Sequence, residues 1–234
     1  MSSSENLRDI AILIPAYQAE ATIAPVIQSV RDLGISVWVV DDASSDQTGR
    51  LAEEAGAQVI RRLVNGGKGA ALRTGFSELL KIPTVEWILM MDADHQHLPE
   101  EIPLFLEARR NNPQAHFFIG NRMHSPEGMP RDRRWTNRFL SGLLSFWTGH
   151  PVPDSQCGFR MVSRRVLENI RLNSSRFEIE SELIIRSARA GFLPVSIPIR
   201  SVYPKRRISF VRPFQDTLRF VRFAVLVWVE REKE

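Results

Sequence analysis

The sequence predicts an α/β fold: a doubly wound, mostly parallel sheet with flanking helices and a C-terminal amphipathic helix. Two observations carry this prediction. Short apolar runs alternate with helical segments through residue 120, which is typical of consecutive βαβ units. Between about residues 213 and 229, apolar residues recur at helical spacing with arginines nearby, which is typical of an amphipathic helix.

The first half of the chain supplies five expected strands. The runs at 10–14 and 87–91 are short, continuous and apolar, as expected for buried strands. The expected strands are 10–14, 35–40, 57–61, 85–91 and 116–120, and the expected helices between them are 22–32, 46–56, 70–80 and 99–110.

After residue 120 the alternation is lost. We expect helices at 135–148, 163–170 and 177–191, with an irregular stretch at 154–160. Residues 193–203 read as a strand, which Pro194 and Pro198 restrict to a sheet edge or a bulge. The predicted organisation is therefore one domain over residues 1–212, followed by the amphipathic helix at 213–234.

The composition fits a globular protein with ample material for a core: 43% of the 234 residues are hydrophobic and 25% are charged. The single cysteine, Cys157, excludes an internal disulfide framework and fits a reducing compartment. We see no secretory signal pattern and no apolar run near the roughly 20 residues that span a bilayer. We therefore expect a cytoplasmic protein.

Two carboxylates follow the expected strand 85–91. Asp92 and Asp94 are separated by Ala93, so in an extended chain they point to the same side and repel each other unless a cation lies between them. Carboxylate oxygens suit a hard divalent cation, Mg²⁺ or Mn²⁺. The alternative is a turn with two solvated aspartates.

Three other strand ends in this half also carry polar signals. Pro15 and Tyr17 follow the first strand, Asp42 follows the second, and Lys68 lies in a glycine-rich turn after the third. In a doubly wound sheet these ends line one crevice, which a nucleotide could fill. The turn at 65–69 lacks the spacing of a Walker phosphate loop. Taken singly, each of these residues could be an ordinary turn or capping residue.

Together these segments resemble the successive motifs of family 2 glycosyltransferases with the GT-A fold. The subgroup they resemble most is the polyprenol-phosphate sugar transferases, such as the dolichol-phosphate mannose synthases. The resemblance covers roughly residues 10–212. It is carried by the segments 14–20, 40–48, 65–71, 92–96, 120–122, 154–160 and 177–182.

The resemblance implies a nucleotide-binding half over about residues 8–121 and an acceptor half over about 122–212. It implies that Pro15, Tyr17 and Asp42 hold the nucleoside, with Lys68 also on the donor side. Asp92 and Ala93 would lie along the ribose and diphosphate. Asp94 and Gln96 would bind the metal ion. The arginines expected to face the phosphates are Arg122, Arg176, Arg206 and Arg207.

The sequence departs from the family pattern at two of these positions. Ala19 stands where the family usually has an acidic residue, and His95 stands where it often has glycine. We expect His95 and His97 to be solvated loop residues; the alternative for His95 is that it tunes the site. The Q-x-x-R-W signature of processive members is absent, which argues against a polymer synthase.

The implied reaction is inversion at the sugar C1 by direct displacement of a nucleoside diphosphate. GDP-mannose and UDP-glucose are both compatible donors. Asp92, Asp94, Arg122 and Asp154 are the expected catalytic residues. Asp154 is our candidate base or acceptor-orienting residue, and its alternative role is to cap the turn at Gly158. Residues 186–222 hold nine Arg or Lys and one acid, which fits a polyprenyl phosphate acceptor.

Other partners and functions stay open at this stage. The amphipathic helix could bind the inner face of the cell membrane, pack on its own domain or form a homodimer contact. A glycosyltransferase with a saccharide or small-molecule acceptor is the first rival function. A nucleotidyltransferase usually needs a glycine-rich, basic loop near its N-terminus. Residues 16–19 contain no glycine and no basic residue, which disfavours this function. We expect no nucleic acid partner, because the basic residues lack regularly interleaved aromatic side chains.

Overall fold

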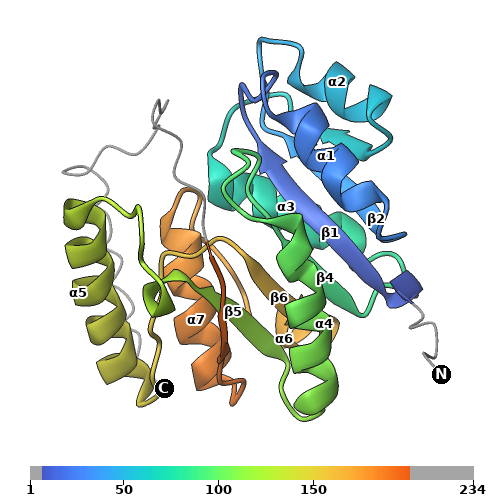
Figure 1. Ribbon diagram of the computed structural model, residues 1–234. Helices are drawn as coiled ribbons and strands as arrows, with labels where there is room; N and C mark the ends of the chain where they lie inside the picture. Colours follow the sequence, from blue (N-terminus) through green and yellow to red (C-terminus); the bar gives the residue numbers. More distant parts are fainter. Residues whose placement is uncertain (1–6, 201–234) are drawn as a thin grey trace.

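The computed structural model describes residues 7–200, and these form one sheet with helices on both faces (Figure 1). The strand order is β3-β2-β1-β4-β6-β5-β7. The strands are β1 (Ile10–Ala16), β2 (Ser36–Asp41), β3 (Gln58–Arg61), β4 (Trp87–Met90), β5 (Phe117–Asn121), β6 (Arg160–Ser163) and β7 (Val195–Pro198). The predicted doubly wound, mostly parallel sheet is confirmed.

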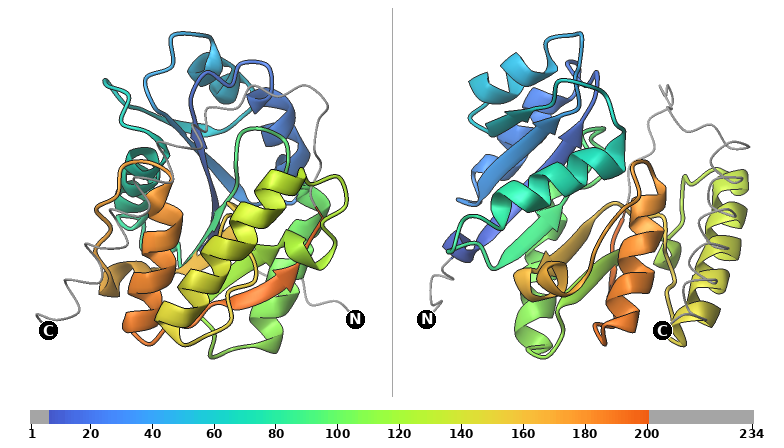
Figure 2. Two further views of the ribbon diagram at one scale, coloured as in Figure 1. Left: turned by 90° about the vertical axis from the view of Figure 1, so that its left-hand side faces the viewer. Right: turned by 180° about the vertical axis from the view of Figure 1, so that it is seen from behind.

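The helices lie in layers on either side of this sheet. Helices α1 and α4 cover one face and α3 and α7 cover the other, while α5 packs along α7 at the outer edge (Figures 1 and 2). The α-helices are α1 (Ile23–Arg31), α2 (Thr48–Glu54), α3 (Lys68–Leu79), α4 (Ile102–Asn111), α5 (Arg131–Thr148), α6 (Arg164–Asn169) and α7 (Glu178–Arg189). Single 3-10 turns are η1 (Leu7–Asp9), η2 (Pro99–Glu101) and η3 (Arg122–His124).

The parallel half of the sheet follows directly from the apolar runs. Strand β1 pairs with β2 on one side and β4 on the other, both in parallel, and Ile10 through Ile14 are at most 1% exposed. Burial on both faces explains why these strands read as continuous apolar runs without alternation. Because the strands are parallel, their carboxyl ends meet at one edge of the sheet.

Strand β6 differs from the sequence prediction. The helix expected at 163–170 is present as α6, with Ser163 as its N-cap. We expected no strand before it, whereas Arg160–Ser163 forms a strand antiparallel to both β4 and β5. The four residues are all buried. The segment is short and begins with an arginine, so it lacks the apolar run that marks the other strands. Its neighbours in the sheet, both distant in sequence, decide its conformation.

The C-terminal part of the predictions lies outside the described residues. This holds for the amphipathic helix at 213–234 and for Arg206 and Arg207. Within residues 7–200, no helix has the length and apolarity needed to cross a bilayer.

Candidate active site

The chain turns sharply just past three neighbouring strand ends. Gln18 after β1, Ala43 after β2 and His95 after β4 have φ angles of +49°, +60° and +59°. These are left-handed conformations that residues other than glycine rarely adopt, and such strain concentrates at functional sites. The conformation of His95 also gives a physical reason for glycine at this position in related sequences.

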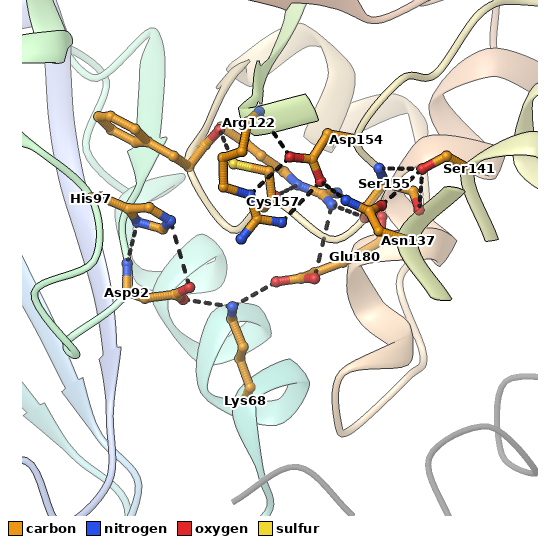
Figure 3. Close-up of polar contacts among 12 residues, drawn as sticks. Lys68, Asp92, His97, Arg122, Asn137, Ser141, Asp154, Ser155, Cys157 and Glu180 are labelled. Carbon is orange, nitrogen blue, oxygen red and sulfur yellow. Dashed lines mark hydrogen bonds and ion pairs between the residues drawn. The ribbon is translucent and has the colours of Figure 1, made fainter. Parts of the chain in front are cut away.

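Asp92 is held by an ammonium group at the centre of the crevice (Figure 3). Lys68 Nζ, at the first residue of α3, lies 2.5 Å from Asp92 Oδ1 and 2.6 Å from Glu180 Oε1 on α7. Burial alone would raise the pKa of Asp92, but the charge of Lys68 holds it at about 2. The pKa of Lys68 is raised in turn: burial would lower it, and Asp92 and Glu180 outweigh that effect. Asp92 is therefore ionised and already paired within the protein.

Asp94 lies beside this pair but has no cation of its own in the described structure. Asp94 is exposed at the surface, but the surrounding protein removes part of the water around its carboxylate, and this loss together with the negative charge of Asp92 raises the pKa of Asp94 to about 6. The backbone N–H of Gln96 donates to Asp94 Oδ1 at 3.1 Å, and the Gln96 amide contacts the other oxygen. A divalent cation would relieve the repulsion, and these oxygen donors are of the type that Mg²⁺ or Mn²⁺ prefers. The residues present thus fit the predicted metal ion.

His97 is not a solvated loop residue, and that prediction is wrong. Its side chain is 2% exposed and stacks on Phe159 with ring centroids 5.0 Å apart. Its Nδ1 accepts a hydrogen bond from the backbone N–H of Asp92 at 3.2 Å. Burial lowers the pKa of His97 to about 4, so the ring is neutral near pH 7. His97 supports the backbone of Asp92 through the hydrogen bond at Nδ1.

Arg122 reaches the crevice from the end of β5, and Asp154 holds it there. Arg122 donates to Asp154 through Nε at 2.8 Å, through Nη2 at 2.9 Å and through its backbone N–H at 2.9 Å. Asn137 on α5 adds a fourth donor at 2.7 Å from Asp154 Oδ1. Burial would raise the pKa of Asp154, but these hydrogen bonds and the charge of Arg122 lower it. The positive charge of Arg122 also acts on Asp92 and Asp94.

Arg160 organises the loop that lies against Asp92. It is 1% exposed, and its guanidinium donates to three carbonyl oxygens, those of Ser155, Cys157 and Glu180, at 2.6–2.7 Å. The same loop passes so close to Asp92 that a Cβ at Gly158 would collide with its carboxylate. Glycine at 158 therefore permits the approach of the two segments.

Asp42 lies at the end of β2 and is 2% exposed. Its carboxylate accepts from the backbone N–H groups of Gly66 and Gly67, just before α3, and pairs with Arg62. The helix N-terminus favours a negative charge at this point. The structure thus places Asp42 in the support of the glycine-rich turn, and its predicted contact with a nucleoside stays a prediction.

The structure also describes four other predicted residues, Pro15, Tyr17, Ala93 and Arg176. Pro15 lines a small cavity with Lys68, Asp92 and Glu180. Tyr17 is 37% exposed, and Ala93 lies buried between the two aspartates. Arg176 is exposed and packs against Gly67, because the loop 174–176 sits on the N-terminus of α3.

Sequence reasoning missed Glu180, Arg160 and Asn137 as parts of this site. All three are polar side chains buried by elements that are distant in sequence. A usable signal existed for two of them, because Arg160 and Glu180 lie in segments that carry the family resemblance. Nothing in the periodicity of α5 distinguished Asn137 from an exposed residue.

Comparison with known proteins agrees with this geometry. The sequence profile described as glycosyl transferase family 2 matches residues 11–171. The chain is 29% identical to a polyprenol monophosphomannose synthase of Mycolicibacterium smegmatis, over 93% of this chain and 85% of that protein. It is 30% identical to an undecaprenyl-phosphate mannosyltransferase of Micrococcus luteus, over 82% and 83% of the two chains.

Among solved structures, the fold is similar to glucosyl-3-phosphoglycerate synthase of Mycobacterium tuberculosis, solved with Mn²⁺, UDP and glucosyl-3-phosphoglycerate. The TM-score is 0.71 and the identity is 21%, over 96% of this chain and 80% of that one. At this identity the similarity supports the fold alone.

Proposed function

Since this chain belongs to glycosyl transferase family 2, we propose that it transfers a hexose from a nucleoside-diphosphate sugar to a polyprenyl phosphate, with inversion at C1. Membership in the family makes it a glycosyltransferase. The donor, the acceptor and the metal ion are the proposed parts, and the named relatives act on polyprenol or undecaprenyl phosphates.

One observation carries the proposal: Asp92, paired with Lys68, and Arg122, held by Asp154, lie in one cluster of polar side chains (Figure 3), with Asp94 two residues along the chain from Asp92. A diphosphate leaving group develops negative charge as the sugar departs, and it needs cations positioned in advance. Arg122 is one such cation, and its orientation is fixed by Asp154. Asp94 and Gln96 would hold Mg²⁺ or Mn²⁺, which supplies Lewis-acid stabilisation of the diphosphate when bound.

The acceptor side of the proposal depends on Asp154. A hydroxyl acceptor needs a base within hydrogen-bond reach, whereas a phosphate is already an anion at neutral pH. Asp154 receives four hydrogen bonds, three of them from Arg122, and its pKa is lowered. This arrangement suits a residue that positions Arg122 better than one that removes a proton. A phosphate acceptor, which needs cations and no base, matches it.

The test is a matrix of donors and acceptors. GDP-mannose and UDP-glucose are each incubated with the full chain, Mn²⁺ or Mg²⁺, and either polyprenyl phosphate, a free saccharide or a small phosphorylated metabolite. We expect a lipid-linked sugar with one donor, and loss of product after chelation with EDTA. If product forms only on the saccharide or the metabolite, the lipid acceptor is wrong and the chain is a glycosyltransferase with a saccharide or small-molecule acceptor.

A further inference from the structure

The outward face of α5 carries three exposed aromatic side chains. Trp135, Phe139 and Phe146 are 76%, 66% and 76% exposed. At about 100° per residue they fall within an arc of about 40° on the helix surface. Scattered exposed apolar residues need no explanation, but a contiguous aromatic stripe marks a surface that contacts something other than water.

Positive charge borders this stripe. Arg131 and Arg138 are exposed and lie, by the same helical geometry, within about 60° of Trp135. Over its whole length α5 contains four arginines and one acid, Asp132. Aromatic residues on one face with arginines beside them are typical of helices that lie in the interface of an anionic bilayer.

The opposite face of α5 is fixed to the active site. Asn137 donates to Asp154, and Ser141 contacts both Asn137 and Ser155 at 3.0 Å. Asn137 contacts Asp154, and Asp154 in turn holds Arg122. The aromatic stripe is therefore separated from Asp154 by little more than the thickness of the helix, about 10–12 Å. Figures 1 and 2 show α5 as the outermost helix on this side of the described structure.

We propose that the outer face of α5, defined by Trp135, Phe139, Phe146, Arg131 and Arg138, docks on an anionic lipid bilayer. The contact would place Arg122 near the depth of the lipid phosphates. This inference deepens the proposed function and rests on it for its purpose, since an acceptor anchored in a bilayer must be met at the membrane surface.

Charge selects the lipid surface over two other occupants. A second copy of the chain would bring another α5, with its four arginines and one acid, against this one and so add like charge. The chain's own apolar segment near the C-terminus carries Arg219 and Arg222 and would also add like charge. Anionic headgroups neutralise these arginines.

The experiment measures co-sedimentation of the full chain with vesicles, without nucleotide and without polyprenyl phosphate. Vesicles of phosphatidylcholine alone are compared with an equal mixture of phosphatidylcholine and phosphatidylglycerol. We expect binding to the mixed vesicles, weakened about 10-fold or more in W135S/F139S/F146S. The variant W135L/F139L/F146L should keep most of the binding. R131Q/R138Q should lose binding to the mixed vesicles, and its binding to vesicles of phosphatidylcholine alone should equal that of the unmodified chain.

The matched control is L63S/V64S, which removes two apolar side chains that are 98% and 73% exposed in the loop after β3. It should bind like the unmodified chain. The proposal is overturned if the unmodified chain stays in the supernatant or if the serine variant binds normally. Equal weakening in the control also overturns it, as does a serine variant that changes only the oligomeric state in analytical ultracentrifugation.

Turnover separates this inference from the proposed function. With a short, water-soluble prenyl phosphate and no vesicles, the serine variant should work as fast as the unmodified chain, which also shows that it folds. Slow turnover by the serine variant but not by the leucine variant would overturn a purely membrane-docking role. If no prenyl phosphate is ever glycosylated while vesicle binding follows the variants as expected, the proposed acceptor fails and the docking surface stands.

Discussion

The two sides of the crevice are stabilised in different ways. On the side of β1, β2 and β4, polar residues follow the strand ends on turns with left-handed backbone, and Asp94 and Tyr17 are exposed to solvent. On the side of α5 and β6, Asp154 is 1% exposed and receives four hydrogen bonds. The first side leaves a carboxylate ready for a ligand, while the second satisfies its carboxylate internally. Two acids of one crevice can therefore have opposite effects on stability and activity.

The largest expected effect separates these two acids by activity. Asp94→Asn should lower kcat about 100-fold or more, because it removes a ligand to the proposed metal ion. At pH 7 it should not lower the free energy of unfolding, since the pKa of Asp94 is raised to about 6 and its negative charge, present above that pH, is unfavourable in the folded protein. Steady-state kinetics and urea unfolding measure the two effects. Asp32→Asn, an exposed acid after α1, is the control; full activity of Asp94→Asn would contradict the metal assignment.

The second prediction concerns Asp154, where we expect a loss of stability in contrast to Asp94. Asp154→Asn should lower the free energy of unfolding by about 3–5 kcal/mol, because it removes the buried carboxylate that pairs with the largely buried guanidinium of Arg122. Urea unfolding at pH 7 measures the loss. Asp132→Asn, on the exposed side of α5, should change it by less than about 0.5 kcal/mol. If Asp154→Asn unfolded like the control, the network would not have the supporting role assigned to it.

The third prediction concerns the contact that joins the two sides. Lys68 bridges Asp92 and Glu180, so its effect on stability should depend on both. In a double-mutant cycle with Lys68→Met and Glu180→Gln, we expect a coupling of about 1–3 kcal/mol in the free energy of unfolding. Additive effects of the two substitutions would mean that the bridge is absent in solution.

The smallest expected effect tests the backbone strain on the open side. His95→Gly should raise stability by up to about 1 kcal/mol, because glycine adopts a φ of +59° without steric cost. The control is Ser125→Gly at a φ of −134°, where glycine should be destabilising. Thermal unfolding of the two variants gives the comparison. If His95→Gly loses as much stability as the control, the backbone at residue 95 is not strained.

The sequence alone was sufficient for the parallel half of the sheet and for the position of its polar strand ends. Apolar runs such as 10–14 and 87–91 are buried on both faces wherever they lie in the sheet, so their local pattern decides their conformation. Parallel strands then bring Asp42, Asp92 and Asp94 to one edge. The family resemblance added the roles of these residues, which local pattern could not supply.

Only the tertiary structure decided how the other side is built. Strand β6, the burial of His97 and the contacts of Glu180 and Asn137 all depend on partners far away in the chain. A polar side chain reads as exposed in sequence, because burial is favourable only when its hydrogen-bond partners are in place. Those partners come from other elements of the fold, so only the folded chain distinguishes Asp154, held by four donors, from the open carboxylate of Asp94.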